Sequence, residues 1–278
     1  MILEAHRVHF AYEDGTVALD EVSLAIRGQE KLAILGANGA GKSTLLSLLN
    51  GSLRPSAGDV LLDGKPVRYG RRDLTELRSR VGLVLQDPDD QLFAATVFED
   101  VSFGPLNLGL SPSDTRDRVT HALDALGIDA LSHRPTHLLS FGQRKRVAIA
   151  GVLAMSPSVL LLDEPTAGLD PKGVEELTET LHVLAANGVA VVVATHDMDM
   201  AHAWADRVAV FATGKIVMDG TPDQVFGTEN FCERSGLRKP IIHQVAQGLR
   251  DLGLMPAGKD LPRGVNDLLR QVRVAITP

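Results

Sequence analysis

Short, continuous apolar runs recur along the first three quarters of the chain. They lie at 30–36, 80–86, 158–164, 189–195 and 207–212. Runs of this length without polar alternation are typical of strands that are buried on both faces of a parallel sheet. Helical patterns lie between them, after "GKST" (41–44), within 170–188 and at 198–207. This alternation of strand and helix predicts an α/β fold with a mostly parallel sheet.

Three other segments depart from this pattern. Residues 1–29 alternate between apolar and polar positions in the manner of antiparallel strands. Residues 87–154 carry mainly helical patterns, which predicts a helical insert in the α/β core. Beyond about residue 225, short amphipathic helical stretches are interrupted by Gly and Pro. We therefore expect a first domain at 1–225 and a small C-terminal extension at 226–278.

A glycine-rich loop follows the first of the buried runs. Residues 36–43 match G-x-x-x-x-G-K-S between a predicted strand and a predicted helix, which is the context that a phosphate-binding loop requires. Its glycines let backbone N–H groups face phosphate oxygens, and the helix N-terminus adds positive potential. A turn that merely contains these letters is the alternative, but the flanking elements favour a nucleoside triphosphate site. The expected binding residues are Gly36, Ala37, Asn38, Gly39, Ala40, Gly41, Lys42, Ser43 and Thr44.

Within this site, we expect Lys42 to reach the β- and γ-phosphates and Ser43 to bind Mg²⁺. Asp163 and Glu164 end another buried run, at the sheet edge where ligands collect in such folds. Asp163 is predicted to hold Mg²⁺ through water, and Glu164 to polarise a water for attack on the γ-phosphate. Charge placed at a helix N-terminus before Pro165 is the alternative for this pair. His196 ends the next strand, where it is either structural or a γ-phosphate contact.

A second anion-binding pattern occurs about a hundred residues after the first. In "HLLSFGQRKRVAIAG" (137–151), Ser, Gly and Gln stand where an apolar stretch ends and a basic, then apolar, helical pattern begins. This arrangement predicts a helix N-terminus that faces an anion. Phe141 lies inside the motif and, because it is bulky, is expected to have ordinary negative φ and to point away from the phosphate.

Composition narrows the function classes. The chain has 278 residues, is 44% hydrophobic, and carries a formal net charge of −7, which argues against a nucleic-acid partner. The single cysteine, Cys232, excludes an internal disulfide. No apolar run approaches the roughly 20 residues that span a bilayer, and the first residues do not resemble a signal peptide. We expect a cytosolic chain whose membrane role comes through partners, at the cytoplasmic face of the membrane.

The ordered motifs resemble those of the nucleotide-binding subunits of ATP-binding cassette (ABC) transporters. They are "GANGAGKST", "GLVLQDP", "LSFGQRKR", "LLLDEPTAGLD" and "ATHD", and the resemblance covers residues 2–225. It implies ATP with Mg²⁺, and a P-loop NTPase (RecA-like) core with an antiparallel β subdomain, a helical insert and a C-terminal appendage. It also implies a catalytic role for Lys42, Glu164, Gln86 and His196.

The same resemblance explains the two anion motifs. It implies that Ser140, Gly142 and Gln143 contact the γ-phosphate of ATP held by a second ATPase subunit, in a head-to-tail dimer with Asp170 at its seam. Both half-sites are present in this chain, which favours a homodimer. The C-terminal extension is then expected to contribute to the dimer contact.

The resemblance assigns two further residues. Tyr12 stands where the family stacks an aromatic ring on adenine, although an ordinary edge-strand tyrosine is the alternative. Gln86 is expected to bind Mg²⁺ or the attacking water and to sense the helical insert, or else to be an exposed loop residue.

Segments 81–110 and 139–155 are most similar to the ATPases of energy-coupling-factor importers, of the cobalt-transport (CbiO-like) type. This similarity implies an integral membrane coupling protein and a substrate-binding membrane protein as partners. Cobalt is the expected substrate and nickel the next, with a vitamin as the alternative. A soluble ABC ATPase of DNA repair or translation and a simple P-loop kinase are the other classes considered. The histidines, among them His121, His133 and His137, fit no tight metal cluster by spacing and are expected at the surface.

Overall fold

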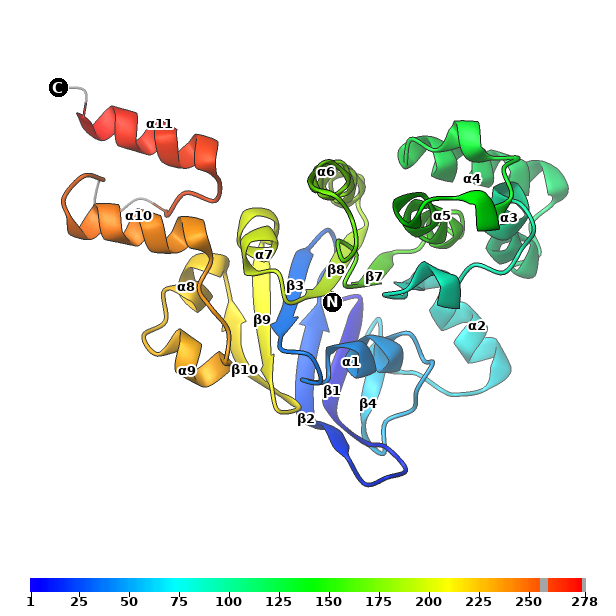
Figure 1. Cartoon of the computed structure of the whole chain (residues 1–278). Coiled ribbons are helices and arrows are strands. Elements are labelled where there is room, and N and C mark those ends of the chain that lie inside the picture. The colour runs from blue at the N-terminus through cyan, green and yellow to red at the C-terminus, as the bar shows by residue number, and fades with distance from the viewer. Residues whose placement is uncertain (256–259, 277–278) are drawn as a thin grey trace.

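The computed structural model describes residues 1–255 and 260–276. Its centre is a six-stranded sheet in the order β10-β9-β3-β8-β7-β6 (Figure 1), parallel except for β10, which pairs antiparallel with β9. The strands are β3 (Lys31–Gly36), β6 (Val81–Val84), β7 (Val159–Asp163), β8 (Ala190–Thr195), β9 (Arg207–Ala212) and β10 (Lys215–Gly220). The five runs read from the sequence are therefore all strands, and β6 is shorter than its run. The α/β prediction is confirmed.

A four-stranded antiparallel sheet completes the lower part of the molecule in Figure 1. Its order is β2-β1-β4-β5, with β1 (Leu3–Ala11), β2 (Val17–Ile26), β4 (Ala57–Leu62) and β5 (Lys65–Pro66). The antiparallel pairing expected within residues 1–29 is that of β1 with β2. The partner strands β4 and β5 had no clear pattern of their own, because each is short and half exposed.

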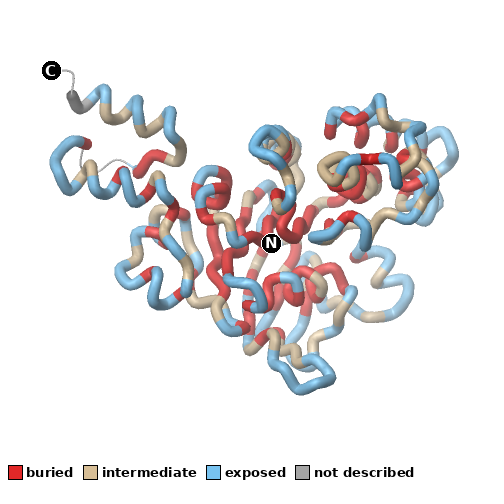
Figure 2. Tube along the Cα trace, in the orientation of Figure 1, coloured by how far each residue is buried: buried red, intermediate tan, exposed pale blue. Residues whose placement is uncertain are grey.

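Each central strand is buried on both faces, which explains the continuous apolar runs. In β3, Leu32 and Ile34 belong to one hydrophobic cluster with α1 (Lys42–Leu49) and the antiparallel sheet. Ala33 and Leu35 belong to another, which faces α5, α6 and α7. Because side chains alternate across a strand, both faces of β3 must be apolar. Figure 2 shows this buried centre in red.

The predicted helical insert forms a separate lobe beside the sheet (Figure 1). Local signals set its helix starts: Thr96 and Glu99 form a capping box, and the Ser111 hydroxyl accepts from Asp114 N. The helices of the insert are α3 (Val97–Asn107), α4 (Pro112–Ala125) and α5 (Phe141–Leu153), with one-turn 3₁₀ segments at Pro88–Asp90, Asp129–Leu131 and Thr136–Leu138. The helix α2 (Arg71–Arg80) lies before the insert and leads into β6.

Two more helices cover the sheet face opposite α1, namely α6 (Pro171–Ala186) and α7 (Met198–Trp204). The chain then continues into α8 (Pro222–Phe226), α9 (Phe231–Ser235), α10 (Ile241–Asp251) and α11 (Val265–Ile276). The last two form a layer at the far side of the molecule from the helical lobe (Figure 1). Residues 256–259 and 277–278 of the expected extension lie outside the described residues. Among the helices that the structure describes, none combines the length and the hydropathy of a membrane span.

A close contact between β6 and α5 generates a stability prediction. A Cβ atom at Gly82 would lie 2.1 Å from Val152 Cγ1, whereas one at Gly151, on the same helix as Val152, would meet no atom within 4 Å. We expect Gly82→Ala to lower the free energy of unfolding by about 1–3 kcal/mol through overpacking. The matched change Gly151→Ala should raise it by up to about 1 kcal/mol, because alanine favours the helix. Urea denaturation measures both, and an unaffected Gly82→Ala protein would contradict the packing described.

Candidate nucleotide-binding site

The glycine-rich loop connects β3 to α1 in a conformation that requires its glycines. Gly39 and Gly41 have positive φ, +78° and +105°. A Cβ at Gly41 would also lie 2.4 Å from the Ala18 carbonyl oxygen, so a side chain is excluded on two grounds. The loop therefore lies tightly against the chain around Ala18, with α1 beginning directly at Lys42.

A cleft of about 400 Å³ opens beside this loop. It brings together most residues that the sequence analysis selected for the nucleotide and its metal: it is lined by Tyr12, Thr16, Val17, Ala18, Asn38, Gly39, Ala40, Gly41, Lys42, Ser43, Thr44, Gln86, Asp163 and Glu164. Gly36 and Ala37 lie behind it, and their carbonyls accept hydrogen bonds from Lys42 Nζ at 2.7 and 3.3 Å. Tyr12 is half exposed and its hydroxyl is 2.8 Å from Thr44 Oγ1.

Asp163 has the surroundings of a ligand to a hard cation. It ends β7, is buried, and its Oδ1 atom has no hydrogen-bond partner among the described residues. Burial raises the pKa of Asp163, and the adjacent Ser43 hydroxyl opposes that rise. Carboxylate, hydroxyl and amide oxygens are the donors that Mg²⁺ takes. The residues present, with Gln86 in the same cleft, therefore fit the expected metal.

Glu164 adopts a strained backbone that its neighbours hold in place. Its φ is +43°, an unfavourable value for a residue with a side chain, at a cost of about 1–3 kcal/mol. Its carboxylate accepts from Thr195 Oγ1 at 3.0 Å and lies 2.9 Å from His196 Nδ1. Lys42 Nζ is 3.6 Å from Glu164 Oε1. The Glu164 carboxylate lines the cleft. His196 is largely exposed and does not line the cleft itself, but it contacts this carboxylate.

Lys145 is a site residue that the sequence analysis missed. It lies in α5, is almost fully buried, and its Nζ donates to the carbonyl oxygens of Glu164 at 2.8 Å and Ala167 at 3.1 Å. Burial lowers the pKa of Lys145, an effect that Glu164 partly offsets. Lys145 shares its helix face with Ala148, Ile149 and Val152, at spacings of three, four and seven. This spacing is the signal in the sequence that Lys145 faces the core. It was missed because Lys145 lies between Arg144 and Arg146 in a basic run.

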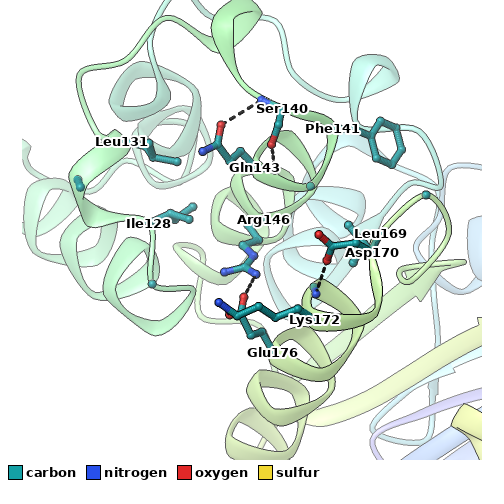
Figure 3. A pocket seen from close by; sticks show the side chains of 15 residues that line it. Ile128, Leu131, Ser140, Phe141, Gln143, Arg146, Leu169, Asp170, Lys172 and Glu176 are labelled. Carbon is teal, nitrogen blue, oxygen red and sulfur yellow. Dashed lines mark hydrogen bonds and ion pairs between the residues drawn. The ribbon is translucent and has the colours of Figure 1, made fainter.

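The second anion motif lies in a different pocket, of about 600 Å³ (Figure 3). Ser140 caps α5 through a capping box with Gln143, and Asp170 caps α6 by accepting from Gly173 N at 2.7 Å. Ser140, Gly142, Gln143 and Asp170 all line this pocket, which shares no lining residue with the cleft at Lys42. Within one chain, the structure thus brings the second motif together with Asp170 but not with the glycine-rich loop.

Phe141 is the first residue of α5 and has no positive φ, as expected. Its ring lies against Gly168, where a Cβ would approach Phe141 Cε1 to 2.7 Å. Figure 3 shows the ring directed away from the Ser140 and Gln143 side chains. Lys145 Nζ is 5.4 Å from the ring centroid, which is within the range of a cation–π contact.

Comparison with known proteins identifies the family of this chain. Residues 19–167 match the ABC transporter family. The chain belongs to that family. This ABC protein is 57% identical to the cobalt import ATP-binding protein CbiO of Rhodobacter capsulatus, over 88% of each chain. It is 46% identical to the energy-coupling factor transporter ATP-binding protein EcfA of Methanocaldococcus jannaschii, over 92% of this chain and 91% of that one.

Solved structures agree with the fold. cbiO1 from Clostridium perfringens, described as part of the ABC transporter complex cbiONQ, has 45% identity and a TM-score of 0.76, covering 90% of this chain and 96% of that one. A dimeric ATP-binding cassette bound to ADP and phosphate has 29% identity and a TM-score of 0.72, covering 79% and 98%. This ABC protein is therefore an ATP-binding, ATP-hydrolysing cassette of the energy-coupling-factor type, and the resemblance inferred from its motifs is confirmed.

The position of Phe141 generates a prediction for ATP turnover. Phe141→Gly should keep the ATPase rate within about tenfold of wild type, because glycine in a helix costs only about 1 kcal/mol and Ser140 and Gly142 are unchanged. Ser140→Ala removes both the helix cap and a hydroxyl aimed into the pocket, and should lower the rate by about ten- to a hundredfold. Steady-state phosphate release measures both variants. A larger loss in Phe141→Gly than in Ser140→Ala would contradict this assignment.

Proposed function

We propose that this ABC ATPase energises uptake of a transition-metal ion, with cobalt favoured over nickel, through an energy-coupling-factor importer. The observation that supports cobalt as the substrate is the 57% identity to the cobalt import protein, which extends over 88% of both chains. A vitamin is the second candidate substrate, supported by the similarity to energy-coupling factor ATPases as a group. The ATPase itself supplies work and does not contact the substrate.

Two separate half-sites support a dimer. The cleft at Lys42 and the pocket at Ser140 share no lining residue, so one bound ATP cannot use both within a chain. A second protomer, turned head to tail, would place its Ser140 helix N-terminus over the γ-phosphate bound by the first. Since this chain carries both halves, a homodimer is the simplest assembly. Asp170, in the pocket with Ser140, would lie at its seam.

Within each composite site, the chain's residues divide the work of phosphoryl transfer. The loop N–H groups and Lys42 would hold the phosphates, and Tyr12 would stack on the adenine. Ser43, Asp163 and Gln86 would hold Mg²⁺, which when bound neutralises phosphate charge. Ser140, Gly142 and Gln143 would complete the cage from the partner.

Glu164 would take a proton from the water that attacks the γ-phosphate. Its carboxylate is already oriented by Thr195 and His196, so little reorganisation is needed to position that water. His196, whose exposed ring lies 2.9 Å from this carboxylate, would contact the γ-phosphate. Lys145 would keep the Glu164 backbone in its strained form.

The remaining parts would couple this chemistry to the membrane. Closure of the dimer would move the two helical lobes, where the membrane coupling protein is expected to dock. The helices α10 and α11 belong to the proposed C-terminal extension, and they expose Ile241, Val245, Val265 and Leu269. These apolar side chains support the proposal that the extension adds a dimer contact. The assembly would then act at the cytoplasmic face of the membrane.

The role of Glu164 is tested by Glu164→Gln. Replacing the carboxylate by an amide removes the proton acceptor but keeps the shape, so hydrolysis should slow by about 10²–10⁴-fold while ATP still binds. ATP binding by fluorescence, phosphate release, and dimer formation by light scattering provide the readouts. The variant should accumulate as an ATP-bound dimer; full hydrolytic activity would exclude Glu164 as the base.

Transport is tested by expressing the chain together with its membrane partners in cells that lack cobalt uptake of their own. We expect ATP-dependent accumulation of radioactive cobalt, competition by nickel, and no accumulation with Glu164→Gln. Labelled biotin is the parallel arm. Uptake of the vitamin alone would replace the proposed substrate, and co-purification with only soluble proteins would refute the importer itself.

A further inference from the structure

Outside the nucleotide sites, three metal-binding side chains converge where the extension meets the ATPase core. His202 comes from α7, Asp223 from α8 and His243 from α10. One possible ligand atom of each lies within 4.8 Å of those of the others. His202 and His243 are 1% and 2% exposed. The sequence hid this cluster because its members lie about twenty residues apart on three helices. His121, His133 and His137, by contrast, are exposed as expected.

Each member of the cluster has a buried polar atom that lacks a partner. Among the described residues, His202 Nε2, Asp223 Oδ1 and His243 Nδ1 form no hydrogen bond. Leaving one such atom unsatisfied typically costs about 1–3 kcal/mol, so native structures rarely keep three together without a ligand. Phe226 closes one side, its ring centroid 5.6 Å from that of His202 and 6.1 Å from that of His243. A single bound ion at this position would satisfy all three atoms at once.

We propose that His202, Asp223 and His243 bind one divalent transition-metal ion of the zinc, cobalt and nickel class. Two imidazoles and one carboxylate suit these ions, whereas Mg²⁺ and Ca²⁺ prefer oxygen donors alone. Binding would draw the three atoms slightly closer, since metal–nitrogen distances are about 2.0–2.1 Å. Water would supply the remaining position. The site is distinct from the Mg²⁺ position at Ser43 and Asp163, and it does not depend on the transported substrate.

Charged side chains surround the cluster. Arg263 and Arg250 act on this region, with Lys239 beside His243, and Asp260 near Asp223 opposes them. These positive groups repel every cation, so a bound ion must gain its free energy from bonds to the two imidazole nitrogens. Such bonds favour the zinc, cobalt and nickel class over Mg²⁺ and Ca²⁺.

The position of α7 suggests what the metal does. Just before this helix, His196 contacts the Glu164 carboxylate, and Asp197 caps the helix by accepting from Met200 N at 3.0 Å. From the same helix, Asp199 Oδ1 accepts from Ile241 N at the start of α10, at 2.7 Å. A metal that joins His202 to His243 would reinforce this link. The metal would therefore lock the extension onto the helix that follows His196 and make docking of the extension sensitive to metal supply.

The test is metal titration of the purified, chelator-treated full chain without nucleotide, in excess Mg²⁺ so that oxygen-donor sites are saturated. The probe is Co²⁺, followed by its visible ligand-field absorption, with Zn²⁺ as competitor. The variants are His243→Gln and Asp223→Asn, and the matched control is His121→Gln, which changes an exposed histidine on α4. Thermal melting without metal establishes that each variant is folded.

We expect wild type and His121→Gln to bind one equivalent of Co²⁺ equally. The affinity of each cluster variant for Co²⁺ should be lower than that of wild type by about tenfold or more. Loss of a partner outside the ligand set already has an effect of this size, and these variants lose a ligand. Hydrogen exchange of the backbone amides of α10 should slow when Co²⁺ is added to wild type but not to the cluster variants. If His243→Gln fails to fold, Asp223→Asn, at a partly exposed position, decides the question alone. Equal affinity in all four proteins, or no Co²⁺ binding by wild type, overturns the proposal.

Discussion

The hydrogen bonds from Lys145 to the Glu164 and Ala167 carbonyls join the two halves of the nucleotide machinery in one chain. Lys145 belongs to α5, which Ser140 caps, and Glu164 directly follows β7. Burying an ammonium group costs free energy unless its hydrogen bonds are satisfied. Here the two carbonyl oxygens accept hydrogen bonds from the ammonium group and provide that compensation. The same hydrogen bonds help to hold Glu164 in its backbone conformation with positive φ. The position of the proposed catalytic carboxylate thus depends on a contact from the helical lobe.

These hydrogen bonds of Lys145 form a physical connection between the two pockets. Although they share no lining residue, α5 leads from Ser140 to Lys145, and the loop held by Lys145 continues to Asp170 in the second pocket. Movement of α5 would therefore act on the Glu164 backbone and on the loop before α6 together. When Ser140 of one protomer contacts the phosphate bound by its partner, the effect could therefore pass through α5 to Glu164 of the same protomer. It gives the proposed dimer a physical route for coupling its two composite sites.

The C-terminal region adds a second connection, through α7. The helix begins two residues after His196, which contacts Glu164, and it binds the extension through Asp199. His202 would add to this link through the proposed metal. Nucleotide chemistry, the extension and the proposed metal site thus meet on one short helix. An importer ATPase with such a link has a way to relate turnover to metal supply without contact with the transported ion.

Much of this was already determined by the sequence. Residues 32–35 had to be apolar on both faces once β3 lay between two layers, so the continuous runs identified the central strands. The glycine-rich loop could be recognised because its residues, among them Gly41 and Lys42, are neighbours in the sequence. The same holds for the Ser140 cap, which involves only the first turn of α5. Asp163 and Glu164 were placed correctly because the carboxyl ends of parallel strands meet at one edge.

Only the tertiary structure decided the contacts between distant segments. The strands β4 and β5 escaped prediction because they are short and poorly buried; β4 gains order by pairing with β1, and β5 by pairing with β4. Lys145 became a buried donor only when α5 packed against the loop after β7. His202, Asp223 and His243 converge because three helices cross, a relation that no spacing along the chain records. Local motifs depend on neighbouring residues and can be read in order, whereas these contacts depend on the free energy of packing whole elements together.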